Sequence, residues 1–330
     1  MRIGVVIPAY NAVPWVGDAI ASVLAQTHRD WRLVVVDDGS TDGTADMAEG
    51  FADQRIRLIR QANSGVSAAR NRGIAELVGG APSPPPPPAR GGGVSAGATL
   101  PLPLREGVGG RGPILFLDAD DRLAPQALSS LAAALAASPR AVAAVGAYAF
   151  ADTGRTRLPP SGCLLRHLLV RNLFANGGHL LIRSVGEFRT DLAYGEDWEF
   201  WIRLALQGPF VATADKSPVL FISQHKGGAY RSLAADPASF VPCMNAIFST
   251  PALLVRFGAT RLAAIRRRTE AENAWIVGRE LIRHGRYSEG CVWLRRSVLA
   301  HPGIKRAALL AAAHVVQRLP PGLRGPFQPY

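Results

Sequence analysis

Apolar and polar residues alternate in blocks along the first eighty positions, and the blocks predict strands and helices in turn. Continuous apolar runs at 3–7 and 33–36 are typical of buried parallel strands. Between them, residues 14–25 begin with proline and place apolar side chains on one face, which predicts a helix. A more exposed strand at 55–60 and a small-residue helix at 65–77 follow. The alternation predicts an α/β fold with a doubly wound sheet, whose ligand binds at the carboxyl ends of the strands.

Acidic residues follow two of these predicted strands. The strand at 33–36 leads into Asp37 and Asp38, and an apolar run at 113–117 leads into Asp118-Ala119-Asp120-Asp121. Carboxylate oxygens suit Mg²⁺ or Mn²⁺, which keep open positions that a diphosphate can fill. The ordinary alternative is a capped turn, because Asp side chains after strands often accept hydrogen bonds from nearby amides.

A second acidic pair, Glu196 and Asp197, precedes a predicted helix at 198–207. Consecutive helical side chains diverge by about 100°, so the two carboxylates cannot perform the same role. Acids in a first helical turn also favour the helix dipole without any catalysis, which is the alternative interpretation. Trp198 and Trp201, three positions apart, are compatible with a sugar-stacking wall and equally with a packed core face.

Five segments, in order, resemble the successive motifs of family 2 glycosyltransferases. They cover about residues 1–230, apart from one insertion, and together they are more specific than any one motif. The segments are Val5-Val6-Ile7-Pro8-Ala9-Tyr10-Asn11, Val36-Asp37-Asp38-Gly39-Ser40-Thr41-Asp42, Asn63-Ser64-Gly65-Val66-Ser67-Ala68-Ala69-Arg70-Asn71, Phe116-Leu117-Asp118-Ala119-Asp120-Asp121 and Gly195-Glu196-Asp197-Trp198-Glu199-Phe200-Trp201-Ile202-Arg203-Leu204.

The resemblance implies a GT-A fold with a mixed, Rossmann-like sheet, a nucleotide-diphosphate sugar donor, commonly a UDP sugar, and inversion at the anomeric carbon. It implies that Pro8 and Tyr10 flank the base, that Asp38 accepts a hydrogen bond from uracil, and that Arg70 lies near the nucleotide. Tyr10 could instead be a half-buried aromatic, Asp38 a turn acceptor, and Arg70 a solvated helix charge.

The same resemblance implies a bound Mn²⁺ or Mg²⁺ ion and a catalytic base. Asp118 would lie near the ribose and the waters of the metal, and Asp120 would bind the metal that bridges the phosphates. His225 would complete the metal shell, although a lone histidine is more often structural. Asp197 is the expected base, with Glu196 as the supporting carboxylate. An ordinary aspartate is already ionised at neutral pH, so this role requires no unusual pKa.

These residues predict an inverting, metal-dependent glycosyltransferase that uses a hydroxyl of a glycan or lipid-linked acceptor. The chain lacks the Gln-x-x-Arg-Trp pattern of processive synthases in the family, so we expect a non-processive enzyme. The alternative is a catalytically silent module that binds a nucleotide sugar or glycan. A sugar nucleotidyltransferase is a further alternative, but the chain start has no Gly-rich, Lys-containing triphosphate loop.

Composition is compatible with an enzyme of this size. The 330 residues are 48% hydrophobic, which is enough for one large domain with an appendage. The cysteines, at 163, 243 and 291, are isolated and predict a reducing cytosol and no zinc site. The first residues show no signal-peptide pattern, and the longest apolar stretches, such as 141–151, are too short to span a bilayer.

The net charge of +12 lies almost entirely at the C-terminal end. From Arg256 onward, fourteen Lys and Arg face four Glu. We therefore predict a basic helical extension over 231–330, in the cytoplasm. Its charge suits contact with an anionic membrane at the inner face of the cell membrane, and equally an ordinary helical subdomain of an arginine-rich protein, rather than nucleic acid. The expected amphipathic positions combine arginines at 266–268, 295–296 and 306 with apolar residues such as Leu262 and Leu294. Residues 275–302 faintly resemble one tetratricopeptide unit.

The stretch 79–113 departs from the family. It contains ten Gly and nine Pro in 35 residues and no periodic apolar pattern, so a disordered or extended loop is expected. Because this insertion enters at the amino end of the following strand, it need not disturb Asp118.

Overall fold

The computed structural model describes residues 1–79, 112–223 and 240–318, and the chain separates into two compact units. The first unit comprises Met1–Leu164 and Leu173–Gln224. The second comprises Leu165–Asn172 and His225–Tyr330. Nearly all of the predicted 79–113 insertion, and the predicted domain boundary at residue 230, lie outside the described residues.

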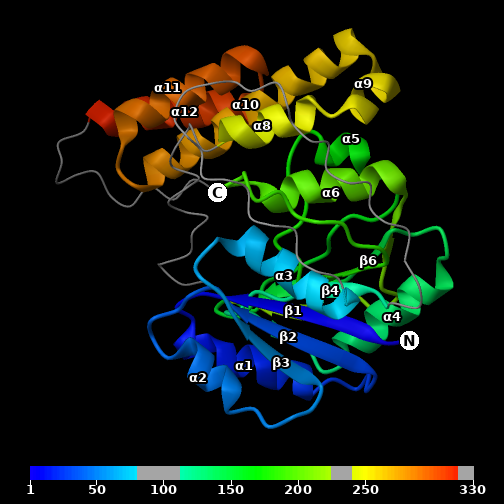
Figure 1. Cartoon of the computed structure of the whole chain (residues 1–330). Helices are drawn as coiled ribbons and strands as arrows, with labels where there is room; N and C mark the ends of the chain where they lie inside the picture. The colour runs from blue at the N-terminus through cyan, green and yellow to red at the C-terminus, as the bar shows by residue number, and fades with distance from the viewer. Residues whose placement is uncertain (80–111, 224–239, 319–330) are drawn as a thin grey trace. The chain divides into compact units, whose positions relative to one another are not determined.

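A seven-stranded mixed sheet forms the centre of the first unit (Figure 1). The first three strands of the chain and β4 are parallel, whereas β9 is antiparallel to both of its neighbours. In spatial order the strands are β10 (Phe210–Ala212), β6 (Ala143–Val145), β9 (Leu180–Ile182), β4 (Ile114–Phe116), β1 (Ile3–Ala9), β2 (Trp31–Asp37) and β3 (Ile56–Arg60). The α/β fold class expected from the alternating pattern is confirmed.

The carboxyl ends of the parallel strands lie at one edge of the sheet. Ala9 of β1 pairs with Asp37 of β2, and Asp37 pairs with Arg60 of β3. The pairing of β1 with β4 ends at Val6 and Phe116. The acidic loops after β2 and β4 therefore leave the sheet on the same side, as parallel strands require.

Helices cover both faces of the sheet. Leu33 and Val35 pack with α1 (Val13–Leu24) and α4 (Ala127–Ala137), whereas Val34 and Val36 pack on the opposite side with α3 (Val66–Val78). This alternation follows from the two-residue period of a strand. The short helix α2 (Thr44–Glu49) contacts α1 and β3, and Figure 1 shows α1 and α2 on the face opposite α3.

A second sheet connects the acidic loop after β4 to later parts of the chain. It contains four strands, of which β11 pairs parallel with β7 and antiparallel with β5. Its strands are β5 (Arg122–Leu123), β11 (Pro218–Ile222), β7 (Ala147–Phe150) and β8 (Thr156–Arg157).

Aromatic side chains hold α6 (Glu196–Gln207) in the first unit. Phe188 stacks on Phe200 of α6 at a centroid distance of 4.2 Å and meets Phe116 of β4 edge-on at 5.0 Å. Trp198 and Trp201 are 4% and 1% exposed. Of the two interpretations of these tryptophans, the packed core face therefore matches the structure, and the start of α6 is held close to the end of β4.

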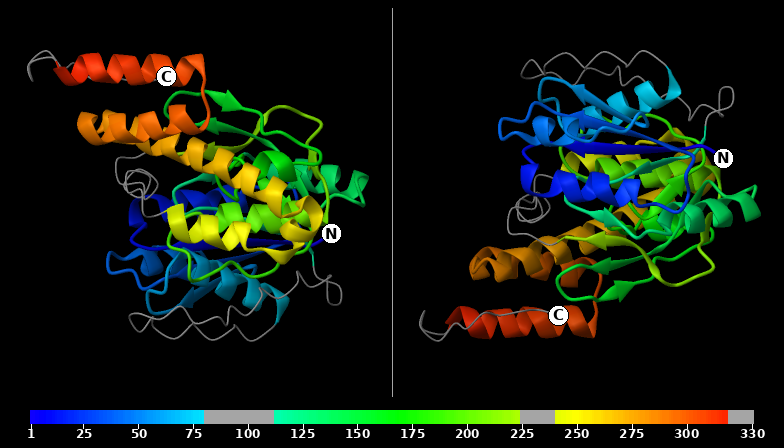
Figure 2. Two further views of the ribbon diagram at one scale, coloured as in Figure 1. Left: turned by 90° about the horizontal axis from the view of Figure 1, so that it is seen from above. Right: turned by 90° about the horizontal axis from the view of Figure 1, so that it is seen from below.

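The second unit is helical (Figure 2). The long helices α10 and α11 are connected by a turn at Gly285 and pack against each other. Their shared core includes Ile282, Tyr287 and Leu294. The stretch 275–302 extends across these two helices, and its faint likeness to one tetratricopeptide unit stays a prediction. The helices are α5 (Leu165–Leu168), α8 (Phe240–Phe248), α9 (Pro251–Phe257), α10 (Ala259–Arg283), α11 (Tyr287–Ala300) and α12 (Ile304–Arg318).

Among the described residues, no single helix has both the length and the apolar composition to cross a bilayer. Helices α8 and α9 satisfy that test only as a pair, and they are bent by 60° relative to each other.

Candidate functional site

Hydrogen bonds join the loops that follow β1 and β2. Asn11 Oδ1 accepts from the amide of Thr41 at 2.9 Å, and Ser40 Oγ accepts from the amide of Asn11 at 3.0 Å. Asn11 has a φ of 47°, a left-handed conformation that asparagine tolerates. Asp42 accepts a hydrogen bond from the amide of Val13 at 3.2 Å. Burial raises the pKa of Asp42, but its hydrogen bonds lower it by more, so its pKa lies below the ordinary value. These contacts give the end of β1 a defined position.

The two residues expected to flank the base lie at this end of β1. Pro8 is buried inside the strand, where it pairs with Val36 beyond the last pairing of β1 with β4. Tyr10 follows the strand and is 53% exposed. The tyrosine ring is therefore accessible for stacking, and the roles of both residues in base binding stay predictions.

Asp38 is buried and accepts three hydrogen bonds from the segment 61–65. Its Oδ1 accepts from Gln61 Nε2 at 2.8 Å and from the amide of Ser64 at 2.9 Å, and its Oδ2 accepts from the amide of Gly65 at 2.8 Å. Gly39 has a φ of 79°, and a Cβ there would lie 2.8 Å from the nitrogen of Asn63, so the loops approach closely only because residue 39 is glycine.

These contacts show how many further hydrogen bonds the Asp38 carboxylate can accept. A carboxylate offers about four lone-pair positions, and three are occupied by donors of the protein. The turn-acceptor interpretation therefore describes what this side chain does within the chain, while uracil recognition by the remaining position stays a prediction.

Arg70 is the central cation of the site. It is 6% exposed, on α3, and its Nη1 donates to Glu196 at 2.9 Å while its Nη2 donates to Asp118 at 3.3 Å. Burial opposes its charge, but Asp118, Glu196 and Asp197 raise the pKa of Arg70 above the ordinary value. Arg70 is thus buried and ion-paired, which rules out the interpretation of a solvated helix charge.

A segment far along the chain supports Arg70. Its guanidinium carbon lies 5.1 Å from the centre of the Phe188 ring. The neighbouring Asn71 exchanges two hydrogen bonds with the backbone of Phe188, at 2.9 and 2.7 Å. Asn71 ends the third motif, but nothing in the sequence indicated its partner.

The loop after β4 concentrates negative charge. Burial raises the pKa of Asp118, with further contributions from Asp120 and Glu196, although Arg70 opposes the shift. Burial, together with Asp118 and Asp120, raises the pKa of Asp121 to about 8. Without a cation, this loop therefore disfavours full ionisation of its carboxylates.

Asp121 connects that loop to two other segments. It accepts hydrogen bonds from the amide of Ser223 at 2.9 Å and from the side chain of Asn176. Ser223 directly follows β11, so Asp121 joins the end of β4 to the end of β11. No sequence pattern pointed to Asn176, because its contact with Asp121 depends on the tertiary fold.

The acidic pair at 196–197 lies at the start of α6. Gly195 before it has a φ of 75°, a conformation that glycine adopts readily. Glu196 faces Arg70, whereas Asp197 Oδ1 accepts from the amide of Trp198 at 2.6 Å. The structure thus places Glu196 in an ion pair and Asp197 beside it, within electrostatic range of Arg70.

The carboxylates after β4 are suitable ligands for a hard divalent cation, but they are few. Among the described residues, no three His, Cys, Asp or Glu side chains are grouped to hold a metal ion. Asp118 is also shared with Arg70. His225, the expected third ligand, lies outside the described residues. A metal held by Asp118 and Asp120 would therefore need further oxygen ligands, such as phosphates.

Comparison with known proteins identifies the first part of the chain. The model of glycosyl transferase family 2 matches residues 4–79. An uncharacterized glycosyltransferase of Rickettsia felis is 42% identical over 79 residues, which are 24% of this chain and 13% of the relative. A putative teichuronic acid biosynthesis glycosyltransferase of Bacillus subtilis, TuaG, is 39% identical over 80 residues, 23% of this chain and 32% of that protein. The matches thus span less than a third of these relatives.

Solved structures resemble the chain over nearly its whole length. S. aureus TarS 1-349 in complex with UDP-GlcNAc has a TM-score of 0.56 at 17% identity, covering 96% of this chain and 88% of that one. The mannosyltransferase PcManGT from Pyrobaculum calidifontis, in complex with GDP-Man and Mn²⁺, has a TM-score of 0.52 at 18% identity, covering 97% and 81%. At such identities the likeness shows the fold, and it confirms the expected GT-A architecture.

Proposed function

We propose that this chain, which belongs to glycosyl transferase family 2 through its residues 4–79, is an inverting, metal-dependent glycosyltransferase. It moves a sugar from a nucleotide-diphosphate donor, in our assignment a UDP sugar, to a hydroxyl of a glycan or lipid-linked acceptor, one transfer at a time. The observation that carries the proposal is the position of Arg70, which bonds both Asp118 and Glu196. One guanidinium thereby brings the acids after β4 and the acids of α6 to a common site.

The donor is held, in this proposal, at the carboxyl ends of β1, β2 and β4. Tyr10, with 53% of its surface exposed, stacks on the base beside Pro8, and the fourth acceptor position of Asp38 binds the uracil ring. The hydrogen bonds between the loops after β1 and β2 support this assignment, because they preorganise the base site.

Asp118, Asp120 and His225 would hold Mn²⁺ or Mg²⁺ together with the donor phosphates. A divalent cation bound there neutralises the charge that grows on the departing diphosphate. The raised pKa values of Asp118 and Asp121 support this assignment, because they identify a loop in which buried carboxylates disfavour each other's ionisation. The Mn²⁺ in the complex of the P. calidifontis mannosyltransferase adds support.

Asp197 acts in this proposal as the general base. The acceptor oxygen forms its bond to the anomeric carbon as the bond to the diphosphate oxygen breaks, and the hydroxyl proton passes to the Asp197 carboxylate. Attack from the face opposite the leaving group inverts the configuration. Arg70 already pairs with Glu196, which supports a positioning role for Glu196 and leaves Asp197 as the base.

We test the proposal by incubating the full-length protein with a panel of nucleotide sugars, Mn²⁺ and glycan or lipid-linked acceptors, and measuring the released nucleoside diphosphate. We expect Asp120→Asn to weaken Mn²⁺-dependent donor binding and Asp197→Asn to retain binding but abolish transfer. Asp46→Asn, at an exposed position of α2, is the matched control and retains activity. Full turnover by both site variants would refute the assignments.

The same assay separates the alternatives. A catalytically silent binding module would bind donors across the panel without releasing nucleoside diphosphate, and a nucleotidyltransferase would release pyrophosphate. We place the reaction in the cytoplasm, and the three cysteines support that placement because none of them forms a disulfide, as expected in a reducing compartment.

A further inference from the structure

One part of the helical unit combines positive charge with a complete lack of acidic residues. Between residues 240 and 269 the chain contains five arginines and neither Asp nor Glu. The next acids along α10, Glu270 and Glu272, are already paired with Arg266 and Arg306. This segment therefore presents a surface of one sign, which ordinary solvated helices with mixed charges do not.

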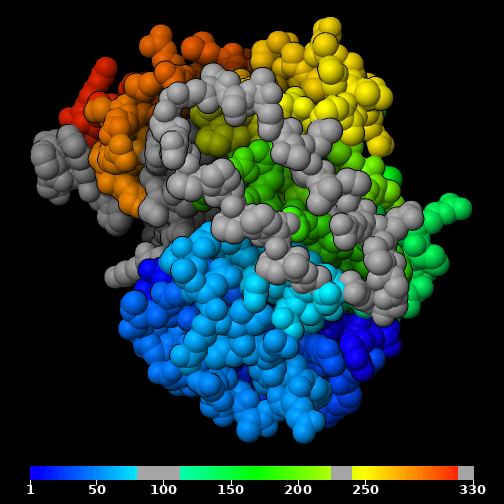
Figure 3. Space-filling model, in the orientation of Figure 1, coloured from blue at the N-terminus to red at the C-terminus, as the bar shows by residue number. Residues whose placement is uncertain are grey.

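Apolar side chains lie exposed in the middle of this segment, on α9. Val255 is 88% exposed and Leu254 is 51% exposed, whereas the adjacent Leu253 is fully buried and anchors the helix. Figure 3 shows the yellow atoms of α9 on the surface at one end of the helical unit. Two neighbouring large apolar side chains on a short, anchored helix are unfavourable in water, so this face suits an apolar partner.

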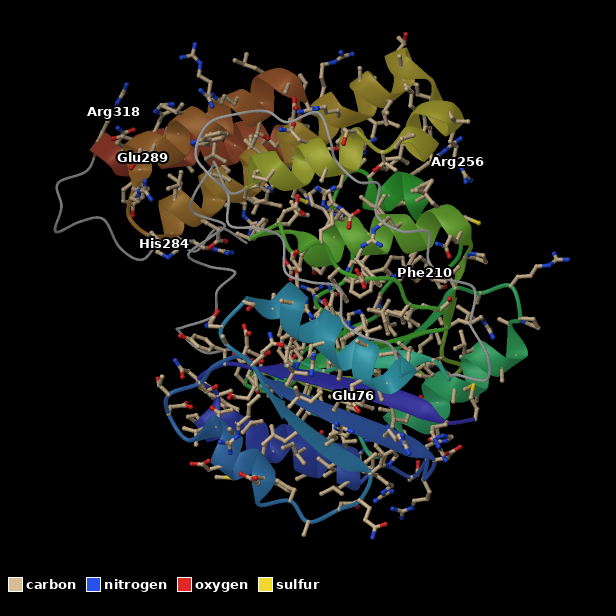
Figure 4. All side chains as sticks on the ribbon, in the orientation of Figure 1. Glu76, Phe210, Arg256, His284, Glu289 and Arg318 are labelled. Atoms are coloured by element: carbon tan, nitrogen blue, oxygen red, sulfur yellow. The ribbon has the colours of Figure 1, made fainter. Side chains whose placement is uncertain are left out.

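Two arginines lie close to these apolar side chains along the chain. Arg256 follows Val255 directly, and Figure 4 shows its side chain directed away from the helices of its unit. Arg261 lies with its guanidinium 5.9 Å from the ring of Phe257, at the end of α9. Both arginines are exposed, and neither has an ion-pair partner within residues 1–79, 112–223 or 240–318. Their charges remain available for a partner that carries anionic groups.

The apolar positions expected from the sequence do not form this surface. Leu262 and Leu294 are 6% and 0% exposed, because they pack inside the helical unit. Most apolar residues of α8, including Met244 and Ile247, are also buried. Since α8 belongs to the core of its unit, the 60° bend between α8 and α9 fits a helix that enters one leaflet from the side better than a pair that spans the bilayer.

We propose that α9 and the first turns of α10, residues 251–268, form an insertion surface for an anionic lipid bilayer. Leu254 and Val255 enter the boundary between headgroups and acyl chains, while Arg256, Arg261, Arg267 and Arg268 bind lipid phosphates. A polyanion such as nucleic acid would use the arginines but would leave the two apolar side chains in water. Lipid binding by this surface does not depend on the proposed sugar transfer.

The first test measures co-sedimentation of the full-length protein with vesicles. We expect binding to equimolar phosphatidylglycerol and phosphatidylcholine but not to phosphatidylcholine alone. Val255→Asp lowers the partition coefficient by about tenfold or more, because a charge replaces an inserted apolar group. Val315→Asp, at a position of α12 that is 62% exposed, is the matched control and changes it by less than about twofold. Equal losses in the two variants would overturn the proposal.

The second test separates local binding from diffuse attraction to a basic protein. Replacing Arg256 and Arg261 by glutamine should weaken vesicle binding about 25-fold, or about fivefold for each charge. Replacing Arg295 and Arg296 of α11 by glutamine removes the same charge and should have little effect. Circular dichroism and Tm verify that each variant folds. Equal weakening by both pairs, or stronger binding to single-stranded DNA than to vesicles with no effect of Val255→Asp, would refute an insertion surface.

Discussion

The acidic loops after β2 and β4 leave the same edge of the sheet, yet the protein surrounds their carboxylates in opposite ways. Asp38 is buried against two backbone amides and Gln61, which together occupy most of its acceptor capacity. After β4, Asp118 and Asp121 lie close to Asp120 and to each other, and burial together with this like charge raises their pKa values. Arg70 compensates only part of that charge.

The difference teaches that the position of an acid at a strand end does not define its role. A carboxylate whose oxygens accept from amides organises the backbone, and the protein has already compensated its charge. A carboxylate that is crowded by others is less stable as an anion, and a divalent cation would reverse that effect. The loop after β2 is therefore a structural support with some residual binding capacity, whereas the loop after β4 is suited to a metal ion and phosphates.

The largest expected effect comes from removing the cation that joins the acids after β4 to α6. Arg70→Met leaves Asp118 and Glu196 without their partner in a partly buried site, so we expect a loss of about 3–5 kcal/mol in unfolding free energy. Arg57→Met is the control, because Arg57 pairs with Glu76 of α3 while 66% exposed and should cost less than about 1 kcal/mol. Urea unfolding at pH 7.5 measures the unfolding free energy of both variants. Glu76, the partner of Arg57, is labelled in Figure 4. Equal costs would mean that Arg70 behaves as a surface charge.

A somewhat smaller effect is expected at Asp38. Asp38→Ala leaves three buried donors without an acceptor, which should lower the unfolding free energy by about 3 kcal/mol. Asp38→Asn keeps one oxygen, so it should cost roughly half as much. Urea unfolding compares the two variants with the wild type. A loss below about 0.5 kcal/mol in Asp38→Ala would show that the amides find water instead, and the contrast between the two loops would disappear.

The first eighty residues could be predicted well from sequence because their elements are long and their periodicity is local. β1, β2 and α1 begin and end within about two residues of the expected positions. The strands β6, β9 and β10 have only three residues each, so no pattern could distinguish them from other apolar runs; tertiary pairing defines them.

The site was predictable by residue type but not by partner. The acids at both strand ends and at 196–197 follow from motifs, whereas the bond from Arg70 to Glu196 connects residues 126 positions apart. The same limit applied to the basic extension: its charge was evident in the sequence, but the tertiary fold decides that Leu262 is buried and Val255 is exposed.

His179 is a buried ionisable group of a third kind. It makes the unfolding free energy depend on pH, and this dependence must be separated from that of the acidic loops. His179 is fully buried, neither ring nitrogen has a hydrogen-bond partner within the described part of the chain, and burial lowers its pKa to about 3. Between pH 6.5 and 3 the unfolded chain therefore binds one more proton than the folded chain, and stability falls as pH falls.

We expect this histidine to reduce the unfolding free energy by about 2 kcal/mol between pH 7 and pH 5. His179→Phe should remove that part of the pH dependence, since the neighbouring rings of Tyr148 and Phe174 offer aromatic contacts. Urea unfolding of both proteins across this range measures the difference. An unchanged slope in the variant would show that His179 is not the group that titrates.

The smallest effect provides the most direct test of the contrast between the loops. Asp120 raises the pKa values of both Asp118 and Asp121, so its charge is a cost to the metal-free protein at pH 8. Asp120→Asn should therefore raise the unfolding free energy by roughly 0.5–1 kcal/mol, opposite in sign to the change expected at Asp38. Millimolar Mn²⁺ with UDP should raise the Tm of the wild type but not that of the variant, so that the wild type becomes the more stable of the two.

Asp46→Asn is the control, because its carboxylate pairs with Arg60 on the surface. It should change neither the unfolding free energy nor the response to Mn²⁺ with UDP by more than a small amount. A destabilised Asp120→Asn protein would mean that the carboxylate of Asp120 supports the backbone as Asp38 does, and the acids after β4 would then be structural as well.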